Sequence, residues 1–407
     1  MAYEMFSTLY CKLPGEVMID ILSRVPIKPL LKFKTVSKSW NALITDPLFI
    51  SMHVDRSAMF EDESLLLLHR HDNNHSTFLY SLSNAEKFKI LDMPRIPYDE
   101  GFWIVGCLNG LLCLTTRNNL FNTNYFLFNP ALREFSPLPQ HQSTLAKFDK
   151  IELVSVGFGY DSRTKDYKMV RLEYYTLSHL HFANADVYTL STDSWKQINV
   201  TSRVYVREMI CKVFVKGTLH WTADQGDNER CIVTYDVENE TFGNLPLPNI
   251  PHIADEIYWE VHVCQELLAI AYCYRQGNNL RFDIWVMDEY GVGQSWKKQF
   301  TVGPHSDFAV LLGISNSCEL LFYNSYYFFV SVFDPTSNKT RHIDIPGSFG
   351  SLEVADYRKS LVTVKRKHHV KRDFNSWKHY DLQFLLFVLL VCLAAYLISS
   401  SIKDFIF

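Results

Sequence analysis

Hydrophobic residues near the start of the chain recur at helical spacing. Val17, Ile21 and Val25 follow one another every fourth residue and give one apolar face, as in an amphipathic helix. Pro26 should end this helix, because proline disfavours helical geometry in the residue before it. Pro29 suits the first turn of a second helix, where a backbone N–H is not needed. The pattern therefore predicts short helices rather than one long one.

A third short helix is expected after Ser37. The Ser37 side chain can cap its first turn, and Val36, Trp40 and Leu43 follow at helical spacing. Three such helices cannot bury this much apolar surface among themselves, because units below roughly 40 residues usually need a partner or a staple. Two interpretations follow: a helical cap on the rest of the chain, or a surface that binds another protein.

After Phe49 the helical periodicity fades and short runs typical of strands begin. An apolar run around an aromatic residue, followed by a polar turn, recurs at intervals of about 50 residues. The aromatic anchors of these runs are Tyr80, Phe128, Tyr188, Tyr235, Trp285 and Phe333. Most runs are preceded by a turn that leads into a buried strand, as in NGLLCL from Asn109 and KGTLHW from Lys216.

In three runs a second aromatic residue follows the anchor at the same distance. These residues are Phe135, Trp195 and Phe242. A period of this length with several strands per unit is typical of β-propeller blades, so six anchors predict a six-bladed propeller. We expect the late strand 360–364 to close the ring against the early run 65–69, because closure hides sheet edges. The alternative is a two-sheet β-sandwich of unrelated strands.

The composition is that of an ordinary globular chain. Of 407 residues, 47% are hydrophobic and 21% charged, and the formal charge is −4. This balance gives no electrostatic case for nucleic acid as the main partner. We therefore expect an α+β multidomain protein with a three-helix unit at 8–54, an all-β domain at 60–364 and a basic linker at 365–381.

The end of the chain differs in character from the rest. Residues 382–402 carry no charge, and their apolar residues would lie all around a helix, unlike those of an amphipathic surface helix. A helix of this length spans about 31 Å, which matches the hydrocarbon core of a membrane. The basic linker before it would stay on the cytosolic side. This predicts an apolar C-terminal helix that anchors the chain in a membrane; a terminal core helix and an apolar extension are the alternatives.

Candidate chemistry is sparse. The nine cysteines show no C-x-x-C pair and no ligand spacing with histidine, which predicts reduced thiols in a cytosolic setting. The first residues do not have the pattern of a secretory signal. GFGYD at Gly157 is not a dinucleotide fingerprint, and the SRTK segment between Asp161 and Asp166 is interpreted as a hairpin turn. His220, next to Trp221 in an expected strand, is interpreted as packed. We expect no catalytic residue, cofactor or metal.

The segment from Leu13 to Phe49 resembles the F-box. That family has Leu-Pro, then Ile-Leu-x-Arg-(Leu/Val)-Pro, a Leu, Val-(Cys/Ser)-Lys-x-Trp and a closing Phe. The matching residues are Leu13, Pro14, Ile21, Leu22, Arg24, Val25, Pro26, Leu30, Val36, Ser37, Lys38, Trp40 and Phe49. The resemblance implies binding to an Skp-family adaptor, which connects F-box proteins to a cullin scaffold. The implied adaptor-binding residues are Leu13, Pro14, Ile21, Leu22, Val25, Pro26, Leu30, Val36 and Trp40. Trp40 is also expected to serve as an internal strut.

The remainder resembles the F-box-associated, kelch-like domain of plant F-box proteins. The segments CLNGLLCL, LFNPALREF, VGFGYDSRTKDYKMVRL and VFVKGTLHW carry this resemblance. Some members of that family are S-locus F-box proteins, but nothing assigns this chain to that subgroup. The resemblance implies a non-catalytic substrate-recognition subunit of an SCF-type ubiquitin ligase, whose β domain binds an unknown target protein for ubiquitination and degradation.

Two other functions stay open at this stage. The chain could bind the adaptor alone, as a binding module without ligase function. It could also be a lectin-like or hydrolase-like propeller with an accessory F-box, which a polar, convergent central channel with several histidines or carboxylates would support. The expected location is the cytoplasm or nucleus, or the cytosolic face of a membrane if the tail inserts.

Overall fold

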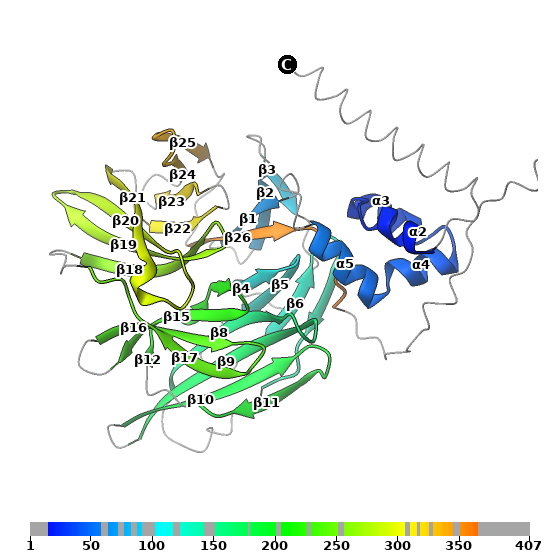
Figure 1. Cartoon of the computed structure of the whole chain (residues 1–407), viewed down its shortest axis with the longest axis horizontal. Coiled ribbons are helices and arrows are strands. Elements are labelled where there is room, and N and C mark those ends of the chain that lie inside the picture. The colour runs from blue at the N-terminus through cyan, green and yellow to red at the C-terminus, as the bar shows by residue number, and fades with distance from the viewer. Residues whose placement is uncertain are drawn as a thin grey trace, which may run out of the picture. The chain divides into compact units, whose positions relative to one another are not determined.

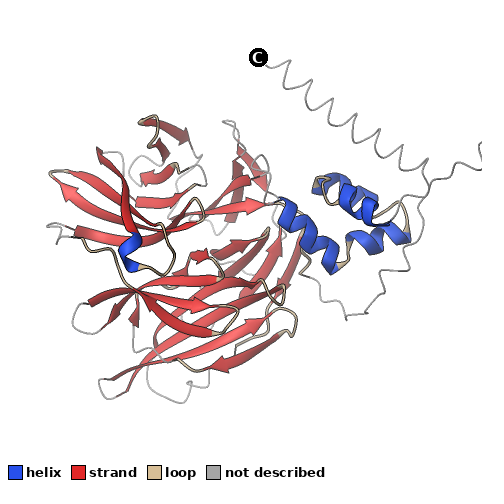
Figure 2. Ribbon diagram, in the orientation of Figure 1, coloured by secondary structure: helices blue, strands red, loops and turns tan. Residues whose placement is uncertain are grey.

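The computed structural model describes two compact units of the chain, one of helices and one of strands (Figures 1 and 2). The described residues are 15–57, 64–71, 77–82, 88–91, 102–116, 123–141, 151–177, 180–200, 205–225, 229–250, 256–305, 310–315, 318–324, 329–344 and 351–364. We refer to residues 15–57 as the helical unit and to residues 64–364 as the β domain.

The helical unit contains short helices whose ends follow from local sequence. Their bounds are α2 (Gly15–Leu22), α3 (Ile27–Phe33), α4 (Lys38–Ile44) and α5 (Pro47–Ser57). Pro26 directly precedes α3, and the Ser37 hydroxyl caps α4 by accepting a hydrogen bond from the Trp40 N–H at 3.2 Å. Both predicted breaks are therefore confirmed. The helix α5 was not predicted; it begins at Pro47, a residue suited to a first helical turn.

The helix α5 is tied to α2 by polar contacts that supplement the apolar core. Arg56 donates to the Asp20 carboxylate at 2.5 Å and to the Asp20 carbonyl oxygen at 2.8 Å. His53 is buried and lies 2.9 Å from the carbonyl oxygen of Val25. Because α5 adds the fully buried Phe49 to the core, the unit buries more apolar surface than three helices alone could bury.

The strands of the β domain form six sheets among the described residues. Sheet B contains β4 (Phe102–Leu108), β5 (Leu111–Thr116), β6 (Tyr125–Asn129) and β7 (Glu134–Pro137). Sheet C contains β8 (Ile151–Asp161), β9 (Asp166–Leu177), β10 (Leu180–Thr189), β11 (Ser194–Ile198) and β13 (Ile210–Cys211). Sheet D contains β12 (Tyr205–Val206), β14 (Val213–Val215), β15 (Thr218–Gln225), β16 (Glu229–Asp236) and β17 (Thr241–Leu245).

Sheets B to F follow one another along the chain, and the last two of them are E and F. Sheet E contains β18 (Glu256–Cys264), β19 (Leu267–Gln276), β20 (Asn279–Met287) and β21 (Trp296–His305). Sheet F contains β22 (Val310–Ile314), β23 (Leu320–Asn324), β24 (Phe329–Asp334) and β25 (Lys339–Asp344). Sheet A joins both ends of the domain through β26 (Ser351–Arg358), β1 (Ser64–His71), β2 (Thr77–Leu82) and β3 (Phe88–Leu91).

The sheets contact one another in a closed circle through their inner strands. The contacting pairs are β26 with β4, β4 with β8, β8 with β15, β15 with β18, β18 with β22, and β22 with β26. A circle of mainly antiparallel sheets is the architecture of a β-propeller. The propeller prediction is thus confirmed, and the β-sandwich alternative is wrong.

The repeated aromatic residues mark the last hairpin of each sheet. Each anchor lies on the strand next to an edge strand of its sheet, and three second aromatics lie directly opposite their anchors. The ring centroids are 6.5 Å apart for Phe128 and Phe135, 5.5 Å for Tyr188 and Trp195, and 4.9 Å for Tyr235 and Phe242. The constant spacing in the sequence is therefore the register of one hairpin, repeated from sheet to sheet.

Ring closure occurs at the predicted early run but with a different late strand. The register of β1 and β26 runs from Ser64 opposite Arg358 to His71 opposite Ser351. Residues 360–364, predicted to close the ring, are not part of a sheet. Instead the buried Asn129 side chain donates hydrogen bonds to the carbonyl oxygens of Ser360 at 3.1 Å and Val362 at 2.6 Å. An apolar run shows that a segment is buried, and it does not distinguish a strand from an extended segment held by a side chain.

The C-terminal predictions concern residues that the structure does not describe. The basic linker 365–381 and the predicted apolar helix and membrane anchor 382–402 lie outside the described residues. None of the helices in the described part of the chain has the length and apolar character needed to span a membrane.

Candidate functional site

Four of the predicted adaptor-binding residues are buried within the helical unit itself. They are Leu22, Val25, Leu30 and Trp40. The Trp40 ring packs edge-on against Phe33, with the ring centroids 5.4 Å apart, as expected of an internal strut. The sequence analysis expected a partner protein to cover these residues, but it did not include α5. In the structure the four side chains pack inside the unit and hold the helices together.

The other predicted residues divide between exposed and undescribed positions. Val36 is 44% exposed, Pro26 is exposed and Ile21 is half-buried. Leu13 and Pro14 lie outside the described residues. The unit therefore keeps apolar side chains at its surface that are available to a partner.

Three further apolar residues of the helical unit are exposed and were not among the predicted adaptor-binding residues. They are Val17, Leu48 and Met52. Val17 lies one turn before Ile21 on α2, so the two residues share a face. Leu48 and Met52 are likewise one turn apart on α5. The only signal in the sequence was the four-residue spacing of these two apolar residues.

Charge on the helical unit is unevenly distributed. Asp20 interacts with both Arg56 and Arg24, and hydrogen bonds from these two guanidinium groups lower the pKa of its carboxyl group. By contrast, Lys28, Lys32 and Lys38 are exposed. The surface between α3 and α4 is therefore basic beside an exposed apolar residue.

A second cluster lies on the inner strands of the β domain. The Lys212 ammonium group is 3.8 Å from the Glu353 carboxylate of β26, which also accepts a hydrogen bond from the Ile104 N–H of β4 at 2.8 Å. On β18 the His262 Nε2 atom lies 3.6 Å from the Glu260 carboxylate. Burial opposes ionisation of Glu260, but His262 and Lys212 more than offset this effect and hold its pKa below the usual value. These charges therefore pair with one another across several sheets.

Glu208 belongs to the same region and has no cation as its main partner. Its carboxylate accepts hydrogen bonds from the backbone N–H of Thr222 at 3.0 Å and from the Thr222 hydroxyl group. Burial raises the pKa of Glu208 to about 7, and the negative charge of Glu260 adds to this effect. Folding therefore favours the protonated form of the Glu208 carboxyl group. No local sequence pattern indicates this cluster, because its members come from separate sheets.

Replacing Glu208 with glutamine is expected to reduce the pH dependence of stability. In the unfolded chain the pKa of Glu208 is near its usual value of 4.5, whereas in the folded chain it is about 7. The wild type therefore loses stability as the pH rises between these values, and the variant gains about 2 kcal/mol relative to it between pH 5 and pH 8. Chemical denaturation at both pH values measures this difference. The exposed Glu289 provides a matched control in a Glu289→Gln variant, and equal pH profiles for all three proteins would contradict the assignment.

His220 is packed, as predicted. It lies buried on β15, and its Nε2 atom is 2.9 Å from the Tyr290 hydroxyl group. Burial lowers the pKa of His220 to about 4, so the imidazole is neutral at physiological pH. Within the described ranges, no group of three or more His, Cys, Asp or Glu side chains is arranged to hold a metal ion.

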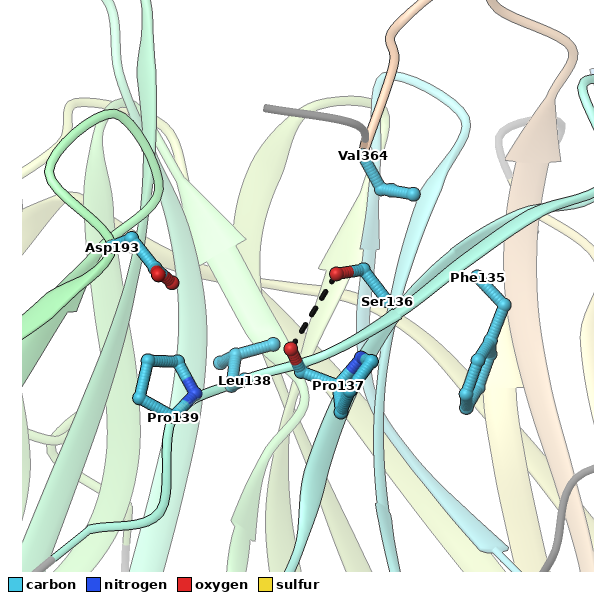
Figure 3. A pocket seen from close by; sticks show the side chains of 7 residues that line it. All are labelled: Phe135, Ser136, Pro137, Leu138, Pro139, Asp193 and Val364. Atoms are coloured by element: carbon cyan, nitrogen blue, oxygen red, sulfur yellow. Dashed lines mark hydrogen bonds between the residues drawn. The ribbon is translucent and has the colours of Figure 1, made fainter. Parts of the chain in front are cut away.

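An open groove lies beside β7 (Figure 3). Pro137, Leu138 and Pro139 lie along it, with Asp193 and Val364 on other sides. Its volume is about 600 Å³. The Asp193 carboxylate accepts a hydrogen bond from the Tyr188 hydroxyl group at 3.0 Å. Most of the other residues that line the groove are apolar.

A polar pocket of about 420 Å³ lies between turns of sheets C and D. Its central cation is Lys168, which is 3.0 Å from Asp161, 3.1 Å from Glu240 and 2.8 Å from the carbonyl oxygen of Val237. Asp161 and Asp166 bound the β8–β9 hairpin, which confirms the predicted turn. Lys168 thus contacts residues of both sheets, and these contacts hold the neighbouring sheets together.

Comparisons with known proteins match both units. The description "F-box domain" fits residues 11–51, and "F-box associated beta propeller domain" fits residues 100–364. F-box protein At3g07870 of Arabidopsis thaliana is 29% identical over 320 residues, covering 72% of this chain and 73% of the relative. F-box/kelch-repeat protein At3g23880 of the same plant is 28% identical over 331 residues, covering 78% and 86%. Among solved structures, TolB from Acinetobacter baumannii has a TM-score of 0.45 at 11% identity over 76% of this chain and 72% of its own, which is too low to support an argument.

Proposed function

The chain belongs to the family of F-box proteins that carry an F-box-associated β-propeller domain, and from this premise we propose that it is a substrate-recognition subunit of an SCF-type ubiquitin ligase. The helical unit binds an Skp-family adaptor, and the adaptor connects it to a cullin scaffold. The β domain binds a target protein and presents it for ubiquitination and degradation. Other subunits supply the chemistry, and this chain supplies proximity, which raises the effective concentration of the target.

The presence of both matched domains in one chain is the observation that carries this proposal. The F-box match accounts for the apolar residues that stay exposed on the helical unit, such as Val17 and Val36. The propeller match accounts for the large β domain, to which we assign the binding of a target protein rather than catalysis.

Direct contact with the adaptor is proposed for the exposed residues Pro26 and Val36 and for the half-buried Ile21. It is also proposed for Leu13 and Pro14, which precede α2 in the sequence and lie outside the described residues. The buried residues Leu22, Val25, Leu30 and Trp40 then act indirectly, by fixing the helices that carry the contact residues. The exposed lysines of α3 and α4 would speed association with an acidic adaptor more than they would tighten the complex.

A Val36→Glu variant is expected to bind the adaptor at least tenfold more weakly, because it places a charge at an apolar contact. The fold should persist, since Val36 is exposed. Binding is measured with a purified Skp-family adaptor on immobilised full-length chain. Met209→Glu is the matched control, because Met209 is an exposed apolar residue of the β domain.

A second variant covers the residues outside the structure. Leu13→Ala combined with Pro14→Ala should also lose adaptor capture while the β domain keeps its melting temperature. Undiminished capture by both variants would show that the adaptor does not bind this surface. Recovery of the adaptor without a cullin from plant tissue would favour the binding module without ligase function.

The lectin-like or hydrolase-like alternative has one observation in its favour. Glu208, Glu260, His262 and Glu353 gather on the inner side of the sheets, which is the polar convergence that this alternative requires. However, Lys212 and the Thr222 N–H occupy these carboxylates. We therefore place this alternative second.

We also infer that the six sheets act as six blades, with sheet A as the blade shared by the two ends of the domain. The proposed location is the cytoplasm or nucleus. Anchoring through residues 382–402 stays a prediction from the sequence.

A further inference from the structure

Two cysteines that are far apart in the sequence meet between sheets E and F. Cys264 is the last residue of β18, and Cys318 lies in the turn that precedes β23. Their Sγ atoms are 2.7 Å apart, although 54 residues separate them in the chain. The side chains are nearly buried, with 3% of Cys264 and 9% of Cys318 exposed. The fold therefore holds the two sulfur atoms in direct contact.

The surroundings of this pair are apolar. Ala269 and Val286 are buried against the two cysteines, and Leu267 and Ile314 pack beside them. No third metal-binding side chain joins the pair in the part of the chain that the structure describes. The immediate environment thus favours a bond between the sulfur atoms over coordination of a metal ion.

The turns that carry the cysteines hold them in place. Gln265 and Glu266, directly after Cys264, have φ angles of 50° and 62°, and Cys318 itself has a φ angle of 62°. Residues with side chains rarely adopt this left-handed conformation. The surrounding structure must therefore fix both turns, and this restraint leaves the two sulfur atoms little freedom to separate.

We propose that Cys264 and Cys318 form a covalent modification site, in which oxidation joins them in a disulfide between sheets E and F. Each thiol loses its proton and the pair loses two electrons. A low-molecular-weight disulfide such as oxidised glutathione accepts the electrons and leaves as two thiols. The exchange passes through a mixed disulfide on one cysteine, which the other cysteine then displaces.

Burial sets the rate of this reaction. It raises the pKa of the Cys264 thiol, and the adjacent Cys318 adds to the shift. Little reactive thiolate therefore exists at neutral pH, and the first exchange with an external oxidant is slow. The second step is fast, because the two sulfur atoms are already in contact. We expect a bond that forms slowly and persists, rather than a rapid redox sensor.

The experiment uses the purified full-length chain after incubation with either oxidised or reduced glutathione. Remaining thiols are blocked with N-ethylmaleimide, and peptides are analysed by mass spectrometry without reduction. We expect one major cross-linked species, joining the peptides that contain Cys264 and Cys318. We also expect the oxidised chain to melt about 5 °C higher, because the bond restricts the unfolded chain.

Variants separate this bond from general effects of the oxidant. Cys264→Ser should remove both the cross-linked peptide and the melting difference. Cys107→Ser, at a half-buried cysteine of sheet B, should retain both. If Cys264→Ser does not fold, the peptide analysis of the wild type still decides the question. Peptides of Cys264 and Cys318 that carry only glutathione or N-ethylmaleimide, or that are joined to other cysteines, would overturn the proposal.

Discussion

Replacing Gly110 with alanine is expected to destabilise the β domain by roughly 4 kcal/mol. Gly110 has a φ angle of 73°, which is unfavourable for a residue with a Cβ atom. An added Cβ would overlap the carbonyl oxygen of Arg358 and lie 2.7 Å from the Ser360 hydroxyl oxygen. Arg358 ends the closing strand β26, so the substitution forces sheet B and the closing segment apart. Guanidinium denaturation of the full-length chain measures the loss.

Gly217 provides a matched control for this prediction. It occupies the corresponding turn of sheet D with a φ angle of 76°, but an added Cβ there meets nothing within 4 Å. Gly217→Ala should therefore cost only the conformational part, about 1 kcal/mol. Equal losses in the two variants would show that the close approach of Arg358 and Ser360 does not restrict Gly110.

Replacing Arg171 with methionine is expected to destabilise the β domain by about 3 to 5 kcal/mol. The Arg171 side chain is buried on β9, where its guanidinium group pairs with the buried carboxylate of Glu173 and donates to the Tyr125 hydroxyl group at 3.2 Å. The His141 imidazole also lies near this carboxylate, with its Nδ1 atom 3.9 Å from Glu173. Without Arg171, this buried carboxylate would lose its main partner. Denaturation curves of the variant and the wild type give the difference in unfolding free energy.

Two further variants test this explanation. Arg171→Met combined with Glu173→Leu should recover most of the lost stability, because the carboxylate is removed along with its partner. Arg341→Met removes an exposed partner of Glu319 and should change stability by less than about 1 kcal/mol. A loss for Arg171→Met no larger than that for Arg341→Met would contradict a role for the buried ion pair.

The parts of the fold that could be predicted are those written in short stretches of sequence. Pro26 and Ser37 act on the backbone beside them, so they reveal where helices end and begin. The pair Phe128 and Phe135 records the register of a single hairpin, and its repetition reveals the propeller. The helix α5 was missed because Leu48 and Met52 face solvent, which weakens the apolar pattern used to recognise a helix.

The parts that could not be predicted depend on contacts between distant residues. Asn129 holds the carbonyl oxygen of Ser360 across 231 positions of sequence, so the residues near Ser360 give no sign that they lie outside a sheet. Lys212 and Glu353 likewise lie far apart in the sequence, between sheets C and D and on β26. For the helical unit, the apolar pattern identifies a surface, but only the packing of α5 shows which of its residues remain exposed.

The pairing of β26 with β1 determines when during protein synthesis the β domain can be completed. The strand β1 leaves the ribosome early, with β2 as one neighbour and its other edge open. That edge stays available to other chains until residues 351–358 have been translated. A premature stop codon anywhere before these residues would leave the sheet permanently open. Newly made chains therefore depend on protection from aggregation throughout the translation of sheets B to F.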